Sequence, residues 1–377
     1  MHNKLCKMAE LKAPESCGSL RSLCIKIVLH YPKLAEKGFS LLPFEVIQAI
    51  LDASVHNRSI GLIQQVLKFW PSPVAVLSGV SSTSRDEEFV ARAVVEYISK
   101  RDEADKVQVI DLRQRNIGFL GSTVLCRAVI AANKDSTLAE VANGTPFNVA
   151  IHLKPVLAVY ADICVNYSNP ETVLKALETK NGFVQLCISA FSAVELGDHR
   201  LSGLLRVLNS DHLVVLDLSY NGLAYYDNVS VDLSSIFQEM QKFTKLRALA
   251  LSYNSLGESH LMNLCKVLEK FPCLVSLDLN GNYVGGCIRL LLNSVNQPLK
   301  CLRLENGRIC DSGIRSIACS KHSTQLTELD ISFNCLSSEC LPDLLFILEA
   351  SKNTLQSLNV SGNEVETVLD LNWQTIC

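Results

Sequence analysis

One eleven-residue pattern occurs six times in the second half of the chain and constrains the fold more than any other feature. Each copy has an apolar residue, two others, Leu, any residue, Leu or a similar residue, two others, usually Asn, any residue and an apolar residue. Copies begin 25 to 33 residues apart, enough for a strand, a turn, a helix and a return. They are LVVLDLSYNGL from Leu213, LRALALSYNSL from Leu246, LVSLDLNGNYV from Leu274, LKCLRLENGRI from Leu299, LTELDISFNCL from Leu326 and LQSLNVSGNEV from Leu355.

The spacing within each copy predicts a short strand with one buried face. In the first copy Leu216 and Leu218 alternate with Asp217, so the two leucines point inward and the Asp points outward. One unit alone covers only part of its apolar surface, and stacked neighbours cover the rest. This is the leucine-rich repeat signature. It predicts an α/β solenoid, a ribonuclease-inhibitor-like horseshoe with parallel strands on the concave face and helices on the convex face.

An Asn follows the strand in five of the six copies, where the chain bends inward and leaves backbone groups unpaired. An amide side chain can both donate and accept hydrogen bonds at such a bend. The pattern therefore predicts a ladder of amides, with a gap at Gly307, which replaces Asn in the fourth copy. The five are Asn221, Asn254, Asn282, Asn334 and Asn363.

Weaker copies extend the array toward the N-terminus. VQVIDLRQRNI from Val107 fits if Arg115 takes the Asn position, and FVQLCISAFSA from Phe183 fits with Phe191 there. Between them, TPFNVAIHL and NPETVLKALE indicate a strand and a helix, and the repeat register stays open from about 135 to 180.

Before residue 107 the pattern becomes helical, which predicts an all-α cap over the first repeat. The helical segments are about 19–30, 42–53, 59–69 and 86–100. We therefore expect a helical cap over 1–106 and a repeat domain over 107–377, with degenerate repeats to about 212 and regular repeats over 213–365.

Composition excludes several classes of protein. The 35 Lys and Arg residues against 38 Asp and Glu residues give no positive field for a nucleic-acid backbone. The 15 cysteines include no CxxC pair, so we expect mostly reduced, buried thiols. No run approaches the roughly 20 apolar residues that span a bilayer. We expect a soluble protein without nucleic-acid or membrane partners, located in the cytoplasm, with the nucleus as a second compartment.

Signatures of catalysis are missing from the sequence. It contains no GxSxG, GxxxxGK[ST] or HExxH motif and no GxGxxG after a strand. His199, His212 and His322 are expected to be surface or half-buried residues rather than ligands or bases. We expect a binding protein that is not an enzyme, with no cofactor and no metal.

The stretch SLRSLCIKIV, from Ser19 to Val28, forms an apolar helical stripe. Packing within the cap explains the stripe. A partner groove is the alternative, because Ser19, Leu20, Cys24 and Val28 match a motif that resembles the elongin C-binding box of ubiquitin-ligase substrate receptors. The motif is loose, since Leu336, Cys340 and Leu344 form a second near-match in a repeat helix.

A second element downstream makes the docking interpretation more specific. In LLPFEVIQAIL, the residues Leu42, Pro43, Val46 and Ile50 resemble a cullin 2 box. Glu45 stands where the cullin 5 type has a second proline, which favours cullin 2. Pro43 also has a purely structural explanation, because a proline can open a helix.

The wider sequence resembles the family of PRAME and leucine-rich-repeat-containing protein 14. The resemblance rests on Leu-Pro before an apolar helix, a helix that ends in Trp70 and Pro71, and the Val-Ile-Asp-Leu strand, and it covers about residues 15–365. It implies an adaptor that is the substrate-recognition subunit of a cullin 2 and elongin B/C ubiquitin ligase. The alternative is a non-ligase scaffold or inhibitor that represses a signalling or transcription factor, of the NF-kappa-B or nuclear-receptor type.

The concave face is the expected site for a protein client. Asp217, Ala250, Asp278, Arg303, Asp330 and Asn359 should form one column of outward strand positions. Acidic and aromatic side chains together suit a basic or mixed peptide. The alternative is that an Asp between the two leucines is simply common in such repeats. The candidate client-binding residues are Asp217, Tyr220, Tyr253, Asp278, Arg303, Asp330 and Phe333.

Family members continue through further repeats, whereas this sequence stops at Cys377. We expect a shortened isoform or gene model whose last repeat lacks its outer helix and cap. The identity of the client does not follow from the sequence.

Overall fold

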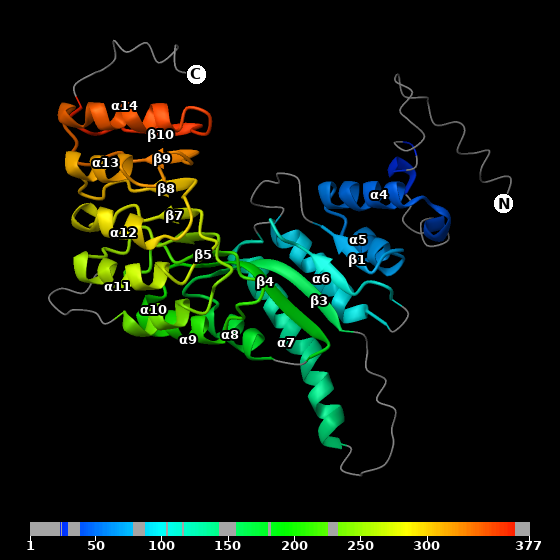
Figure 1. Ribbon diagram of the computed structural model, residues 1–377. Helices are drawn as coiled ribbons and strands as arrows, with labels where there is room; N and C mark the ends of the chain where they lie inside the picture. Colours follow the sequence, from blue (N-terminus) through cyan, green and yellow to red (C-terminus); the bar gives the residue numbers. More distant parts are fainter. Residues whose placement is uncertain are drawn as a thin grey trace.

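The computed structural model describes residues 23, 25–28, 38–77, 87–102, 105–114, 117–142, 156–179, 182–224 and 233–365. Its strands form one open sheet of ten parallel strands that follow one another in chain order (Figure 1). The strands are β1 Val74–Val76, β2 Val109–Asp111, β3 Leu157–Val165, β4 Val184–Ala193, β5 Val215–Asp217, β6 Ala248–Ala250, β7 Ser276–Asp278, β8 Cys301–Arg303, β9 Glu328–Asp330 and β10 Ser357–Asn359.

Helices alternate with these strands and stack in a layer beside the sheet (Figure 1). The helices of the repeat region are α7 Gly118–Ala142, α8 Pro170–Glu178, α9 Gly197–Val207, α10 Ser234–Met240, α11 Glu258–Leu268, α12 Ile288–Ser294, α13 Asp311–Ala318 and α14 Leu341–Ala350, with short 3-10 turns η2 Gly285–Cys287 and η3 Ser338–Cys340. This arrangement confirms the α/β leucine-rich repeat solenoid. No described helix has the length and apolar character needed to cross a membrane.

The alternation of leucines builds the core as predicted. Leu216 and Leu218 are fully buried, whereas Asp217 between them is half-buried. Strand register places Leu216 beside Leu249, which lies beside Leu277 in the next strand. Each fully buried leucine contributes about 1.5 to 3 kcal/mol relative to exposure. The inward column therefore holds consecutive repeats together.

The amide ladder is also confirmed. Asn254 is fully buried, and its Nδ2 donates to the carbonyls of Leu218 and Leu251, both at 2.9 Å. Its Oδ1 accepts from the backbone N–H of Asn221 at 2.9 Å. One side chain thus joins two repeats at the bend after the strand.

At Gly307 a backbone group takes over from the missing amide. The Gly307 carbonyl accepts from the N–H groups of Val284 and Gly285, both at 3.0 Å. Asn334 of the next repeat accepts from the Gly307 N–H at 2.8 Å. The predicted gap is therefore a gap in side chains that backbone hydrogen bonds close.

The N-terminal helices occur close to the predicted segments, and one strand lies among them. They are residues 25–28, the 3-10 turn η1 Phe39–Leu41, α4 Phe44–His56, α5 Ile60–Lys68 and α6 Glu87–Lys100. The segment 1–106 is not entirely helical, because β1 pairs with β2. The sheet begins with β1, in which the buried Ala75 alternates with the exposed Val74 and Val76 as expected of a strand.

The weaker repeats differ from the predicted register. Phe191 pairs with Leu216 and is fully buried, so it is an inward strand residue and the prediction that it replaces the ladder Asn is wrong. The reason is that β4 is ten residues long and its register with β3 shifts between Ala161 and Ile163. The predicted helix NPETVLKALE is α8. Arg115 and the predicted strand 145–153 lie outside the described residues.

Candidate functional site

The strand register brings the predicted outward column together. Asp217, Ala250, Asp278, Arg303, Asp330 and Asn359 are consecutive Cα partners across β5 to β10. They lie on the face of the sheet opposite the inward leucines, which we call the open face. It corresponds to the concave face of the sequence prediction.

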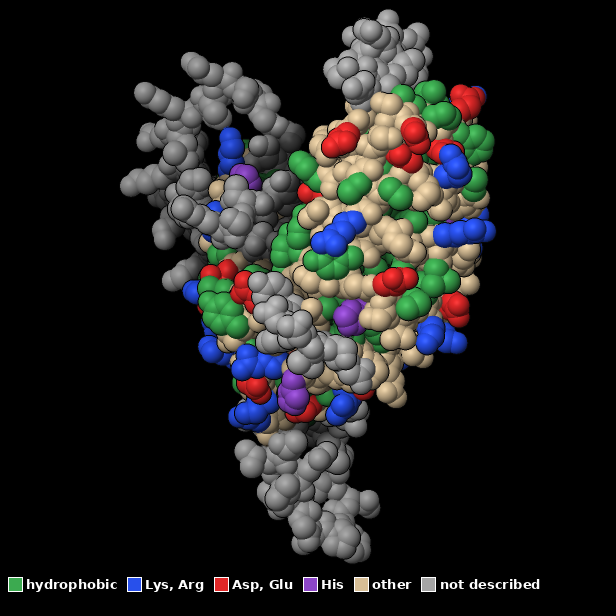
Figure 2. All heavy atoms as spheres, turned by 90° about the vertical axis from the view of Figure 1, so that its left-hand side faces the viewer, with side chains coloured by type: hydrophobic (Ala, Val, Ile, Leu, Met, Phe, Trp, Pro, Cys, Tyr) green, Lys and Arg blue, Asp and Glu red, His purple; other side chains and the backbone are tan. Residues whose placement is uncertain are grey.

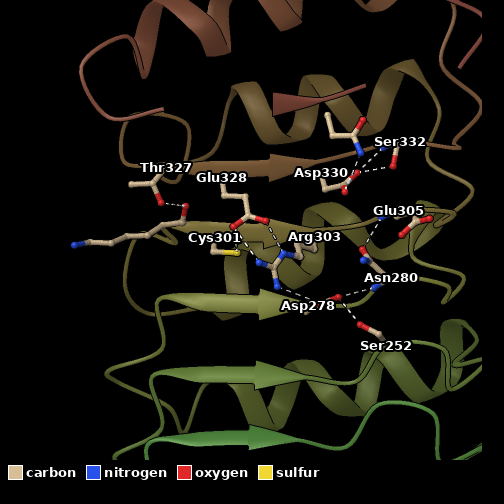
Figure 3. A network of polar contacts seen from close by, with 12 residues as sticks. Ser252, Asp278, Asn280, Cys301, Arg303, Glu305, Thr327, Glu328, Asp330 and Ser332 are labelled. Carbon is tan, nitrogen blue, oxygen red and sulfur yellow. Dashed lines mark hydrogen bonds and ion pairs between the residues drawn. The ribbon is translucent and has the colours of Figure 1, made fainter. Parts of the chain in front are cut away.

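Arg303 is at the centre of a charged network on the open face (Figure 3). Its Nε lies 2.6 Å from Oε1 of Glu328, and one terminal nitrogen lies 3.0 Å from Oε2, so the pair is bidentate. The other terminal nitrogen is 3.5 Å from Oδ2 of Asp278. The hydrogen bond from Arg303 holds the pKa of the Glu328 carboxyl below its usual range. The guanidinium therefore fixes two acids from neighbouring strands.

Two acids of the column also accept hydrogen bonds from residues at the ends of the strands. Asp278 Oδ1 accepts the Ser252 hydroxyl and the Asn280 N–H, the latter at 3.1 Å. Asp330 Oδ1 accepts the Ser332 hydroxyl at 2.6 Å and the Ser332 N–H at 3.0 Å. Since Asp278 and Asp330 are only half-buried, they combine a structural role with a surface that a partner can reach.

A row of exposed aromatic side chains follows the ends of three strands. Tyr220, Tyr253 and Phe333, here the aromatic row, are 56%, 37% and 58% exposed. All three have left-handed backbone angles, with φ of 59°, 55° and 53°. A bulky residue in this region is strained, and such strain is typical of functional positions.

Glycines of the next repeats make room for two of these rings. A Cβ added to Gly281 would lie 2.5 Å from the ring of Tyr253, and one added to Gly362 would lie 2.5 Å from the ring of Phe333. Tyr253 also donates its hydroxyl to Glu305 at 3.2 Å. Burial, followed by the nearby Glu305, raises the pKa of Tyr253 to about 12, so its hydroxyl stays a donor at neutral pH. The rings are therefore held in place rather than freely rotating.

The elongin C-type box falls largely outside the described residues. Ser19, Leu20 and Cys24 belong to that part of the chain. Val28 is buried at 8% exposure, which fixes the helix to the core. Leu23 and Ile27 are 50% and 38% exposed, so the predicted single apolar face is divided between the core and the surface.

The cullin-type box is partly surface and partly core. Pro43 is exposed and caps α4, where its carbonyl accepts from the N–H groups of Val46 and Ile47 at 3.0 and 3.2 Å. Leu42 and Val46 are half-buried, whereas Ile50 is fully buried. The structural explanation of Pro43 therefore holds, and Ile50 supports α4 from within the core.

Several site residues were missed by sequence reasoning. Glu328 and Glu305 bind Arg303 and Tyr253, and both lie on the open face. Glu328 shares its strand face with Asp330 by simple alternation, so the sequence held a signal for it. Leu41 and Phe44, on either side of Leu42 and Pro43 of the cullin-type box, are 82% and 46% exposed.

Other candidate chemistry is limited. In the part of the chain that the structure describes, no three His, Cys, Asp or Glu side chains are grouped to hold a metal ion. The face in Figure 2 carries Lys and Arg interspersed with Asp and Glu.

His199 is exposed and His212 half-buried, as predicted, but His322 is fully buried, because it contacts the backbone of Leu292 and Leu299.

Comparison with known proteins agrees with the repeat architecture. A leucine-rich repeat family model matches residues 322–339 and 351–368. The chain is 23% identical over 384 residues to leucine-rich repeat-containing protein 14 of Rattus norvegicus, covering 91% of this chain and 75% of the relative. The Homo sapiens protein of that name is 27% identical over 212 residues, covering 54% of this chain and 42% of the relative.

Among solved structures, the chain is similar to the crystal structure of the Rad7 and Elc1 complex in yeast. The TM-score is 0.44 and the sequence identity 15%, covering 92% of this chain and 88% of that chain.

Proposed function

Because this chain is a leucine-rich repeat protein related to leucine-rich repeat-containing protein 14, of the PRAME family, we propose that it is a protein-binding adaptor without catalytic activity of its own. In this role it is the substrate-recognition subunit of a ubiquitin ligase built on cullin 2 and elongins B and C. The open face binds the client, and the N-terminal helices dock the ligase.

The observation that carries the client-binding part is the aromatic row. Tyr220, Tyr253 and Phe333 are exposed, and each keeps a bulky side chain at a strained left-handed position. Aromatic side chains that are held in place supply much of the energy of protein interfaces at little cost in conformational entropy. Asp217 and Glu305 at the same strand ends favour a client segment that carries basic side chains.

Exposed apolar side chains beside both boxes support the docking part. Leu23 and Ile27 face solvent on the first helix, four residues apart. Leu41 and Phe44 do so on either side of Leu42 and Pro43. Spaced apolar anchors of this kind suit binding of a helix in a partner groove. Packing of Val28 and Ile50 into the core keeps the two elements in place.

The docking part is tested with purified proteins. The full chain is mixed with elongin B–elongin C and cullin 2, and complexes are separated by size-exclusion chromatography. We expect a stable complex that is lost with Leu20→Ser plus Cys24→Phe and weakened by Leu41→Asp. Leu290→Asp is the matched control, because Leu290 is also exposed, at 46%, but on α12. Absence of a complex with the unaltered chain would refute the ligase role.

The client part has a separate readout. Proteins cross-linked to the chain in cells are identified by mass spectrometry for the unaltered chain and for Tyr220→Gly plus Phe333→Gly. We expect the double variant to lose clients but to keep elongins and cullin 2. If clients are lost while the unaltered chain binds no elongin, the scaffold or inhibitor alternative is favoured.

A further inference from the structure

Two exposed cysteines from neighbouring repeats lie side by side in the segments that lead from β8 and β9 to the following helices. The backbone N–H of Cys335 donates to the carbonyl of Ile309 at 2.9 Å, directly before Cys310. Cys310 and Cys335 are both exposed. In a parallel ladder this contact makes Cys335 the partner of Cys310. Paired strands lie roughly 4.7 to 4.9 Å apart, within the roughly 4.4 to 6.8 Å between α-carbons that disulfides span.

The next pair of repeats shows the same pairing. Ser337 and Glu364 form a parallel bridge. Ser337 follows the inward Leu329 by eight residues, as Cys310 follows Leu302, and Glu364 follows Leu358 by six residues, as Cys335 follows Leu329. The repeat therefore places Cys310 opposite Cys335, with both side chains on the same side.

Cys310 is also the more reactive type of thiol. It precedes α13, and its Sγ lies 3.2 Å from the Ser312 hydroxyl. The Ser312 hydroxyl, and the backbone N–H groups at the start of α13, lower the pKa of the Cys310 thiol. In contrast, burial raises the pKa of Cys126, Cys265 and Cys340.

We propose that Cys310 and Cys335 are a thiol-oxidation site that forms a reversible disulfide with hydrogen peroxide as the oxidant. The Cys310 thiolate attacks peroxide; a sulfur–oxygen bond forms, the oxygen–oxygen bond breaks and hydroxide leaves, which gives a sulfenic acid. The Cys335 sulfur then attacks the Cys310 sulfur. The sulfur–sulfur bond forms as the sulfur–oxygen bond breaks, and the leaving hydroxide takes the Cys335 proton to give water. Two thiols lose two electrons, and one peroxide is reduced to two waters.

Such a bond joins two repeats at the start of α13. Cys310 precedes Asp311, whose carboxylate binds the Ser337 N–H at 2.9 Å and hydroxyl at 2.7 Å. The disulfide adds a covalent link beside this contact. Because reversible disulfides in reducing compartments usually sense or transmit oxidation, the site gives the adaptor a redox-sensitive element.

The test uses the full chain and peptide mass spectrometry. Reduced protein is treated with hydrogen peroxide, free thiols are blocked, and the protein is digested without reductant by trypsin and a glutamyl protease, which separates Cys335 from Cys340. We expect a Cys310–Cys335 linked peptide as the main disulfide product and its loss after dithiothreitol. Cys319→Ser is the matched control, because Cys319 is also exposed and follows α13, and it leaves the linked peptide unchanged.

Two variants separate the steps. In Cys335→Ser, dimedone traps a sulfenic acid at Cys310. In Cys310→Ser, we expect several-fold less dimedone adduct at Cys335 than the Cys335→Ser variant gives at Cys310. Circular dichroism melting verifies that both variants fold. Failure to find the linked peptide in the unaltered chain, or equal oxidation of Cys319 and Cys310, overturns the proposal.

Discussion

The ring of Tyr220 is stacked on the ring of Tyr253, with centroids 4.7 Å apart and planes 11° apart. Both residues hold left-handed backbone angles, at positions where the corresponding residues of two other repeats are Gly281 and Gly362. Glycine adopts left-handed backbone angles without the Cβ clash that other residues have there. The rings are thus retained at a cost in backbone strain, which is expected of a surface that serves binding.

The strain predicts an unusual order of stability. Tyr220→Gly should be more stable than Tyr220→Ala by roughly 0.5 to 1 kcal/mol, because Gly relieves the left-handed strain but loses more chain entropy. Urea denaturation of both variants measures the difference. At Leu290, within α12, the order should reverse, with Ala more stable than Gly by about 1 kcal/mol. Equal stability of the two Tyr220 variants would show that the backbone there is unstrained.

Periodic features could be predicted from the sequence, and features that depend on single tertiary contacts could not. Leu216 and Asn254 repeat at fixed spacing, so their burial and roles followed from the pattern. Phe191 was misplaced because a long strand with a register shift interrupts the spacing. His322 is buried because backbone groups of the preceding repeat surround it.

The candidate site shows the same division. Alternation along each strand predicted the outward column that includes Asp278 and Arg303. It did not predict that Arg303 binds Glu328 more closely than Asp278, because that choice depends on side-chain geometry between strands. Nor did it reveal the strain at Tyr253, which is a backbone property of the bend.

The amide ladder predicts a large effect from one buried Asn. Asn254→Ala leaves the buried N–H groups of Asn221 and Leu223 without their acceptor. The carbonyls of Leu218 and Leu251 keep donors from the Asn221 and Asn282 side chains. Unpaired buried polar groups cost about 1 to 3 kcal/mol each, so we expect at least about 2 kcal/mol of destabilisation by chemical denaturation. Asn263→Ala is the control, because Asn263 is exposed on α11, and should change stability by less than about 0.5 kcal/mol. Similar losses in both variants would argue against the ladder.

The ion pair of Arg303 and Glu328 predicts a pH-dependent contribution to stability. Because Arg303 lowers the pKa of Glu328 in the folded state, the stabilisation is present above the unfolded-state pKa of Glu and is lost as the pH falls through the folded-state pKa. The melting-temperature gap between the unaltered chain and Arg303→Met should be wide near pH 7 and narrow near about pH 3. Arg247→Met, at an exposed position before β6, should show no such narrowing. A gap independent of pH contradicts the pairing.

His322 predicts acid sensitivity of the repeat core. Its Nδ1 accepts from the Leu299 N–H at 2.9 Å, and Nε2 lies 2.8 Å from the Leu292 carbonyl, so the neutral ring with a proton on Nε2 satisfies both groups. Burial lowers the pKa of His322. The stabilisation is therefore complete above the unfolded-state value of about 6.5 and is lost as the pH falls from there through the folded-state pKa.

Replacing this histidine should consequently matter most at neutral pH. His322→Ala should unfold more easily than the unaltered chain by about 2 to 4 kcal/mol near pH 7.5, because two buried backbone groups lose their partner. Near about pH 5 the difference should shrink, since the unaltered chain loses part of its own stabilisation there. Urea denaturation at both pH values measures it, with His199→Ala, at an exposed position, as the control. If the His322→Ala difference were the same at both pH values, a charged ring would have to be tolerated in the core, and the neutral assignment would fail.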